Sequence, residues 1–267
     1  MKYKDLLEKL FDFKKKLEIY DYIHHKREFF NIMKEFRHFI SNMKNEETYN
    51  ELYHSEHYAE LKVFFTEKNN YFVRAMESIE ALSIMTKGEH GCKFLDLLDA
   101  EQIVDNYNRK GEDIQSIDFK EGQSLVMVGC GPFPETLMYF YENTPISHVV
   151  GIDNNYEAIY IAGEMIHSLG LTDIDLAYMD GQEFDYSYAD IVYIPGFIPN
   201  KGELLNRIAE SAKEDVQILV FSPKFLSTLI YDKVPLELHP RLKIAETYDV
   251  GSSAYTSREM IKIEKYK

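Results

Sequence analysis

The first 86 residues carry a helical pattern of hydrophobic and polar positions, and neither glycine nor proline interrupts it. Apolar side chains recur there at steps of three and four residues, which is the spacing of one face of an α-helix. The clearest examples are Leu6, Leu7, Leu10, Phe11, Phe13, Leu17, Phe29, Phe30, Ile32, Met33, Phe36, Phe39 and Ile40. The pattern predicts a helical bundle, with further helices between residues 56 and 86.

The rest of the chain changes to short apolar runs rich in Val and Ile, most of them followed by a helical stretch. These runs occupy residues 124–131, 148–153, 174–180, 189–196 and 216–223. Strands that alternate with helices predict a parallel sheet. Two last strand candidates, 243–250 and 260–267, are joined by a link short enough for a hairpin. We therefore expect an α/β fold, a class I methyltransferase-like Rossmann sheet of seven strands with an antiparallel last hairpin.

The polar segment 108–123 separates these two patterns. We expect an N-terminal helical bundle over residues 1–107 and a Rossmann-like domain over residues 108–267. The formal net charge of −15 argues against nucleic acid and against an anionic membrane surface as partners. A small cationic or zwitterionic substrate suits that charge better, and the chain is compatible with a homodimer.

Two cysteines, Cys92 and Cys130, provide neither a disulfide framework nor a zinc quartet, and we expect no metal. The charged start of the sequence lacks the apolar segment of a signal peptide, and no run approaches 18 apolar residues. These features favour a reducing, cytoplasmic location.

The segment "LVMVGCGPFPET" at 125–136 is the main candidate for a ligand site. Ligands of open parallel sheets bind at the carboxyl ends of the strands, where Gly129 and Gly131 would let the backbone approach them closely. The following helix would begin at Pro132 or Pro134, because proline suits a first helical turn. Position 134 lacks the third glycine of the dinucleotide fingerprint. S-adenosylmethionine has no phosphate, so it tolerates this change, and we predict it as the ligand.

Two acids follow the next two strands. Asp153 and its neighbour Asn154 end the second strand, where a carboxylate can accept both ribose hydroxyls. Asp180, Gly181 and Gln182 end the third, and Asp180 is placed to accept from an adenine amine. Each acid also has a purely structural interpretation, because Asp153 could cap a helix and Asp180 could belong to a turn.

The turn also resembles the G-x-G-x-x-P-x-T turn of nicotianamine synthases and of the bacterial aminobutanoyltransferases that make opine metallophores. Gly129, Gly131, Pro134 and Thr136 fill that pattern, and "VVGIDNNYEAI" is similar to the family's second-strand segment. The resemblance implies that Glu77 is an active-site glutamate on the last bundle helix and that Tyr107 lies near the substrate. The family usually has an arginine and a glycine after strand five, where this chain reads "SPKFLST" and Lys224 is the available cation.

The resemblance implies transfer of the 3-amino-3-carboxypropyl group of S-adenosylmethionine to a small amine or amino acid, with release of methylthioadenosine. Glu77 would accept the proton of the attacking amine. Three alternatives stay open at this point. They are cyclisation of S-adenosylmethionine to azetidine-2-carboxylate, methyl transfer to a small molecule, and cofactor binding by a regulatory protein without turnover.

Overall fold

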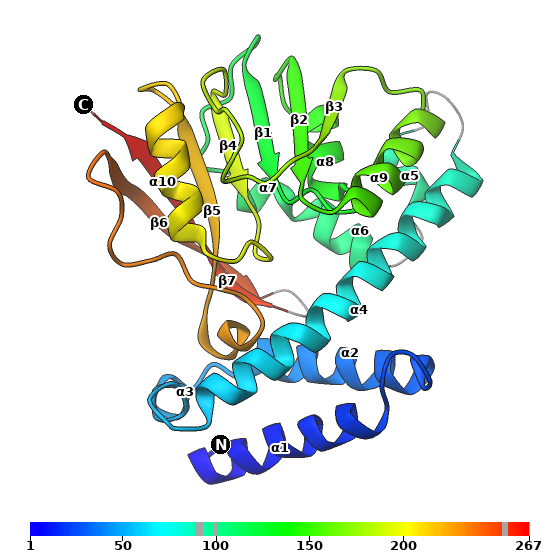
Figure 1. Cartoon of the computed structure of the whole chain (residues 1–267), viewed down its shortest axis with the longest axis vertical. Coiled ribbons are helices and arrows are strands. Elements are labelled where there is room, and N and C mark those ends of the chain that lie inside the picture. Colours follow the sequence, from blue (N-terminus) through cyan, green and yellow to red (C-terminus); the bar gives the residue numbers. More distant parts are fainter. Residues whose placement is uncertain (89–92, 99–100, 253–255, 267) are drawn as a thin grey trace. The chain divides into compact units, whose positions relative to one another are not determined.

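The computed structural model describes residues 1–88, 93–98, 101–252 and 256–266. They form two compact units (Figure 1). We call the first the helical unit; it comprises Met1–Ala75, Ser222–Lys233 and Gly251–Glu259. The second, the sheet unit, comprises Met76–Phe221, Val234–Val250 and Met260–Lys267. No helix in the described ranges is both long and apolar enough to cross a bilayer.

The helical unit confirms the amphipathic pattern of the first 86 residues. Its helices are α1 (Tyr3–Ile19), α2 (Lys26–Asn42), α3 (Glu46–Tyr53) and the first part of α4 (Tyr58–Lys87). The apolar face of α1 is buried at the expected spacing, at Leu6, Leu10, Phe13 and Leu17. The rings of Phe36 and Phe65 stack with centroids 4.1 Å apart, so α2 and α4 share one core.

Residues 222–233 belong to the helical unit because α4 binds their backbone. Lys62 Nζ donates to the carbonyl oxygens of Thr228 and Tyr231, at 3.0 and 3.2 Å, and the Thr66 hydroxyl donates to that of Leu229. This stretch includes the 3₁₀ helix η1 (Phe225–Leu229).

The sheet unit is built around seven strands in the order β3-β2-β1-β4-β5-β7-β6. They are β1 (Ser124–Val128), β2 (His148–Asp153), β3 (Ile174–Tyr178), β4 (Ile191–Ile194), β5 (Gln217–Pro223), β6 (Leu242–Ser252) and β7 (Ser257–Lys265). Strands β1 to β5 pair in parallel. The final hairpin is antiparallel, so the predicted methyltransferase-like sheet is confirmed. The order reverses between β1 and β4, and such a switch point is where open α/β sheets bind ligands.

Helices cover both faces of this sheet. The helix α10 (Lys201–Ser211) packs Leu204, Leu205 and Ile208 into the core that contains Val126 and Val192. On the other face, α8 (Glu135–Asn143) places Phe140 against the ring of Tyr193, with centroids 5.5 Å apart. The helix α9 (Tyr156–Ser168) follows β2, whereas residues 179–190 link β3 to β4 by turns.

The two units do not coincide with the expected domains 1–107 and 108–267. The division at Ala75 falls within α4, so the end of α4 belongs to the sheet unit together with α5 (Phe94–Leu97), α6 (Glu101–Asn108) and α7 (Lys110–Asp113). The reason is packing, because the ring of Phe94 lies against that of Phe133, with centroids 5.6 Å apart.

Candidate functional site

The glycine turn follows β1 and bends back toward β2. Gly129 and Gly131 have φ values of +68° and +69°, in the left-handed region that favours glycine. The amides of Gly129 and Cys130 both donate to the carbonyl oxygen of Ile152, at 2.7 and 3.1 Å. The helix α8 begins at Glu135 with Pro134 as its N-cap residue, one position after the later of the two predicted starts, and Thr136 is buried in its first turn.

Asp153 joins this turn to the loop between β2 and α9 through its two carboxylate oxygens. Oδ2 accepts the amide of Gly131 at 3.0 Å, and Oδ1 accepts the amide of Asn155 at 2.8 Å. The cap of α9 is Asn155, whose side chain accepts from the amides of Glu157 and Ala158. The helix-cap interpretation of Asp153 is therefore wrong. Its neighbour Asn154 is exposed.

Glu77 meets the same turn from α4. A β-carbon built on Gly131 would lie 2.8 Å from Oε2 of Glu77, so the carboxylate lies directly against the glycine backbone. Glu77, which the resemblance implies, and Asp153, which was predicted from its place at the end of the second strand, thus both lie at Gly131. Burial raises the pKa of the Cys130 thiol, and the negative charges of Asp153 and Glu77 raise it further.

Asp180, Gly181 and Gln182 follow β3, beside the end of β2. The amide of Met179 donates to the carbonyl oxygen of Asp153 at 3.0 Å, which ties the two strand ends together. Oδ1 of Asp180 accepts the amide of Gln182 at 2.9 Å, as in an Asx turn. The Gln182 side chain is exposed. The turn interpretation of Asp180 therefore describes its local geometry, while a role in adenine binding stays a prediction.

Tyr107 is placed differently from the other predicted residues. It is 3% exposed, and its hydroxyl donates to Oε2 of Glu142 and accepts from Nδ2 of Asn143 at 3.2 Å. Burial and the Glu142 carboxylate both raise the pKa of Tyr107. Glu142 and Asn143 end α8, whereas the glycine turn lies at its start, about 12 Å away along a helix of this length. These bonds hold the hydroxyl at the end of α8, which favours a structural role, and a role of Tyr107 near the substrate stays a prediction.

Lys224, the available cation after strand five, belongs to the helical unit. Its Nζ lies 5.6 Å from the ring centroid of Phe225. Phe225 itself has a φ of +47°, so a bulky side chain occupies a backbone conformation that favours glycine.

Sequence reasoning missed Ile198, which follows β4. A β-carbon on Gly129 would collide with Cδ1 of Ile198, so this side chain lies against the first glycine as Glu77 lies against the second. Strand order is the signal that would have found it, because β4 pairs directly with β1, Val126 lying opposite Val192.

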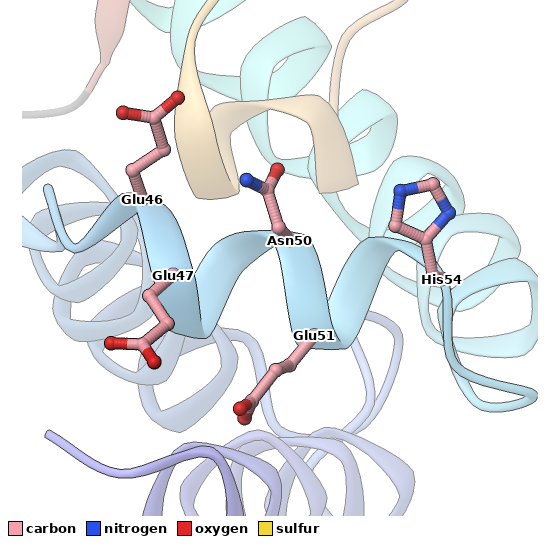
Figure 2. Close-up of a pocket in the computed structure, with 5 residues that line it drawn as sticks. All are labelled: Glu46, Glu47, Asn50, Glu51 and His54. Carbon is pink, nitrogen blue, oxygen red and sulfur yellow. The ribbon is translucent and has the colours of Figure 1, made fainter.

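An open hollow on the surface of α3 carries none of the predicted site residues. Figure 2 shows Glu46, Asn50 and His54 on one side of this helix and Glu47 and Glu51 on the other, so the lining side chains do not converge on one point. In the ranges that the structure describes, no three His, Cys, Asp or Glu side chains are grouped as they would be to hold a metal ion. Cys92 lies outside these ranges.

Comparison with known proteins finds similarity in structure and none in sequence. No protein-family model and no curated protein matches the chain. MtNAS in complex with MTA and tNA has a TM-score of 0.83 at 13% identity, covering 98% of this chain and 98% of that chain. A Glu-to-Gln variant of MtNAS in complex with S-adenosylmethionine has a TM-score of 0.79 at 12% identity, covering 97% of this chain and 98% of that chain. MtNAS is a nicotianamine synthase, and this chain has a nicotianamine synthase-like fold over nearly its whole length.

Proposed function

We propose that this protein is an S-adenosylmethionine-dependent transferase that moves the 3-amino-3-carboxypropyl group to a small amine or amino acid. The observation that carries the proposal is the position of the Glu77 carboxylate against Gly131, in the turn that Asp153 also holds. A carboxylate from a helix outside the sheet thereby reaches the switch point, where a sheet of this kind binds its ligand.

The residues at the turn fit an adenosyl group. Each carboxylate oxygen of Asp153 accepts one backbone amide, which leaves a second lone pair on each oxygen for a ribose hydroxyl. The charge of the site also fits, because the carboxylates of Glu77 and Asp153 favour a sulfonium and an ammonium group. S-adenosylmethionine supplies an electrophilic carbon next to its sulfonium and a thioether leaving group.

In the proposed transfer, the acceptor nitrogen attacks the γ-carbon of the aminocarboxypropyl group. The carbon–sulfur bond breaks, its electron pair goes to sulfur, and methylthioadenosine leaves. The attacking amine must lose one proton, and Glu77 is the carboxylate at the turn that we assign to accept it. The structural neighbours support the proposed transfer as a whole, since a Glu-to-Gln variant of MtNAS binds S-adenosylmethionine and MtNAS binds MTA and tNA.

The test is to incubate the purified protein with S-adenosylmethionine, alone and with single amino acids, and to identify products by mass. Methylthioadenosine is expected only when an acceptor is present. Methylthioadenosine with a cyclic amino acid from S-adenosylmethionine alone would mean intramolecular cyclisation. S-adenosylhomocysteine would mean methyl transfer, and binding without turnover would mean a regulatory protein. Each of these outcomes would overturn the proposal.

The variant Glu77→Gln should lower the rate of methylthioadenosine formation by about 100-fold or more, the usual contribution of a general base. The matched control is Glu80→Gln, one helical turn further along α4 and also half-buried, where burial raises the pKa of the carboxyl. This control should retain the wild-type rate within about twofold. Equal losses in both variants would contradict the role of Glu77.

A further inference from the structure

Lys201 is a charged side chain in an unfavourable place. It is 1% exposed, although lysine is rarely buried without compensation. It is also the first residue of α10, where the helix dipole disfavours a cation. Its Nζ donates to the carbonyl oxygen of Gly196 at 3.2 Å. The buried ammonium group thus contacts the backbone of the preceding loop.

That loop comprises residues 195–200 and leads from β4 to α10. Pro195 and Pro199 restrict its backbone, and Asn200 turns it into α10 with a φ of +49°. The carbonyl oxygen of Asn200 accepts the amide of Glu203 at 3.0 Å, so the loop is joined to the helix at this end. Lys201 fixes it near the other end, at Gly196.

The loop forms one side of the glycine turn. Ile198 lies against Gly129, where a β-carbon would collide with it, while Glu77 lies against Gly131. The hydrogen bond to Gly196 and the left-handed residue Asn200 bracket Ile198 on its two sides. An ammonium group outside the turn thus bonds the loop that carries this apolar wall.

We propose that Lys201 is a positioning residue of the ligand site: through Gly196 it sets the loop 195–200 so that Ile198 closes the Gly129 side of the turn. The proposal rests on the proposed function, since it takes the ligand to be S-adenosylmethionine. It adds to that function the residue that fixes the apolar wall formed by Ile198. It also predicts that ligand binding depends on a buried side chain outside the turn.

The test compares Lys201→Met with Lys213→Met. Lys213 forms an ion pair with Asp190, which immediately precedes β4, so the control removes a lysine from the same unit at the opposite end of the same strand. S-adenosylmethionine binding is measured by calorimetry and stability by thermal unfolding. Both variants should be less stable than the wild type. Only Lys201→Met should bind about tenfold more weakly, because it loses a charge-assisted hydrogen bond that orders the site.

Hydrogen exchange of the ligand-free protein provides a second readout that does not require binding. The amides of Phe197 and Ile198 should exchange faster in Lys201→Met and at the wild-type rate in Lys213→Met. If Lys201→Met does not fold, Lys201→Gln keeps a donor for Gly196 without the charge and should show both effects to a smaller extent. The variant Ile198→Ala should weaken binding similarly, and adding it to Lys201→Met should cause little further loss.

The outcomes separate this proposal from the proposed function. Unchanged binding and unchanged exchange in the Lys201 variants would overturn the positioning role, as would an equal loss of affinity in Lys213→Met. A wild-type protein that binds no S-adenosylmethionine would refute the proposed function instead. The exchange measurement would then still decide whether Lys201 orders the loop.

Discussion

Replacement of Gly131 by alanine tests the arrangement of the turn most directly. The new methyl carbon would lie 2.8 Å from Oε2 of Glu77, and ordinary contact begins at 3.4 Å, so the carboxylate must retreat by about 0.6 Å. The clash is with the end of a flexible side chain, so the fold itself can adjust. The φ of +69° adds backbone strain of roughly 1–2 kcal/mol for a residue with a β-carbon.

The backbone strain and the displacement of the carboxylate can be measured separately. The strain should lower the melting temperature by about 2–4 °C for each kcal/mol in a protein of this size. The displaced carboxylate should lower the rate of methylthioadenosine formation by about 10- to 100-fold, because misplacing a catalytic group by about 1 Å can cost 100-fold. The first is measured by calorimetric unfolding and the second by chromatography of the nucleoside product.

Gly122→Ala is the matched control. Gly122 has a φ of +84°, and a β-carbon there would meet nothing within 4 Å. This variant carries the strain without the contact, so it should lose stability to a similar extent and keep its activity. Wild-type activity in Gly131→Ala, or an equal loss of activity in Gly122→Ala, would refute the assignment of Glu77 to the turn.

Three further changes test individual groups. Asp153→Asn should weaken S-adenosylmethionine binding by about tenfold or more in calorimetry, because the amide removes a charged acceptor. Unchanged affinity would contradict its assignment. Tyr107→Phe should destabilise the protein by about 1.5–3 kcal/mol in urea unfolding, through loss of the hydrogen bond to Glu142. Its activity should stay within twofold, and a large loss would support the predicted catalytic role of Tyr107. Burial alone would raise the pKa of Asp190, but the hydrogen bonds from Lys213 and Ser124 and the charge of Lys213 together outweigh it and hold the pKa below the ordinary 3.8. The stability lost in Asp190→Asn should therefore be greatest at neutral pH and diminish as the pH falls below about 4 in urea unfolding, whereas a pH-independent difference would argue against the ion pair.

The fold was largely predictable because the local spacing of apolar residues indicates each helix and strand. A buried strand such as Val126–Val128 needs continuous apolar residues when helices cover both faces of the sheet, and α1 needs Leu6, Leu10 and Leu17 on one face. The unit boundary was not predictable in this way. It depends on packing between distant segments, such as Lys62 with the carbonyl of Thr228, and periodicity carries no information about such contacts.

From the pattern alone, the site was predictable only where its residues follow strand ends, and Glu77 on α4 came from the family resemblance instead. Gly129, Gly131 and Asp153 lie at the ends of β1 and β2, so strand pattern and residue type locate them together. Residue type does not single out Ile198 and Lys201, and only the strand order, in which β4 pairs with β1 across a reversal, indicates that they lie near the turn. A buried lysine looks in sequence like any surface lysine, and only the structure shows that Lys201 is buried and bonds the carbonyl of Gly196.

The double role of Asp153 indicates how the turn can be formed before any ligand arrives. Its two oxygens already accept the amides of Gly131 and Asn155, so the carboxylate is fixed by the fold and a ligand need not order it. A preformed site loses less entropy on binding, and more of the contact energy then appears as affinity. The same hydrogen bonds fix the backbone of Gly131, against which Glu77 lies. Asp153, assigned to the ribose, and Glu77, assigned to the proton, thus both contact Gly131. For this reason a single methyl group at Gly131 should lower the rate of turnover far more than it lowers the stability of the fold.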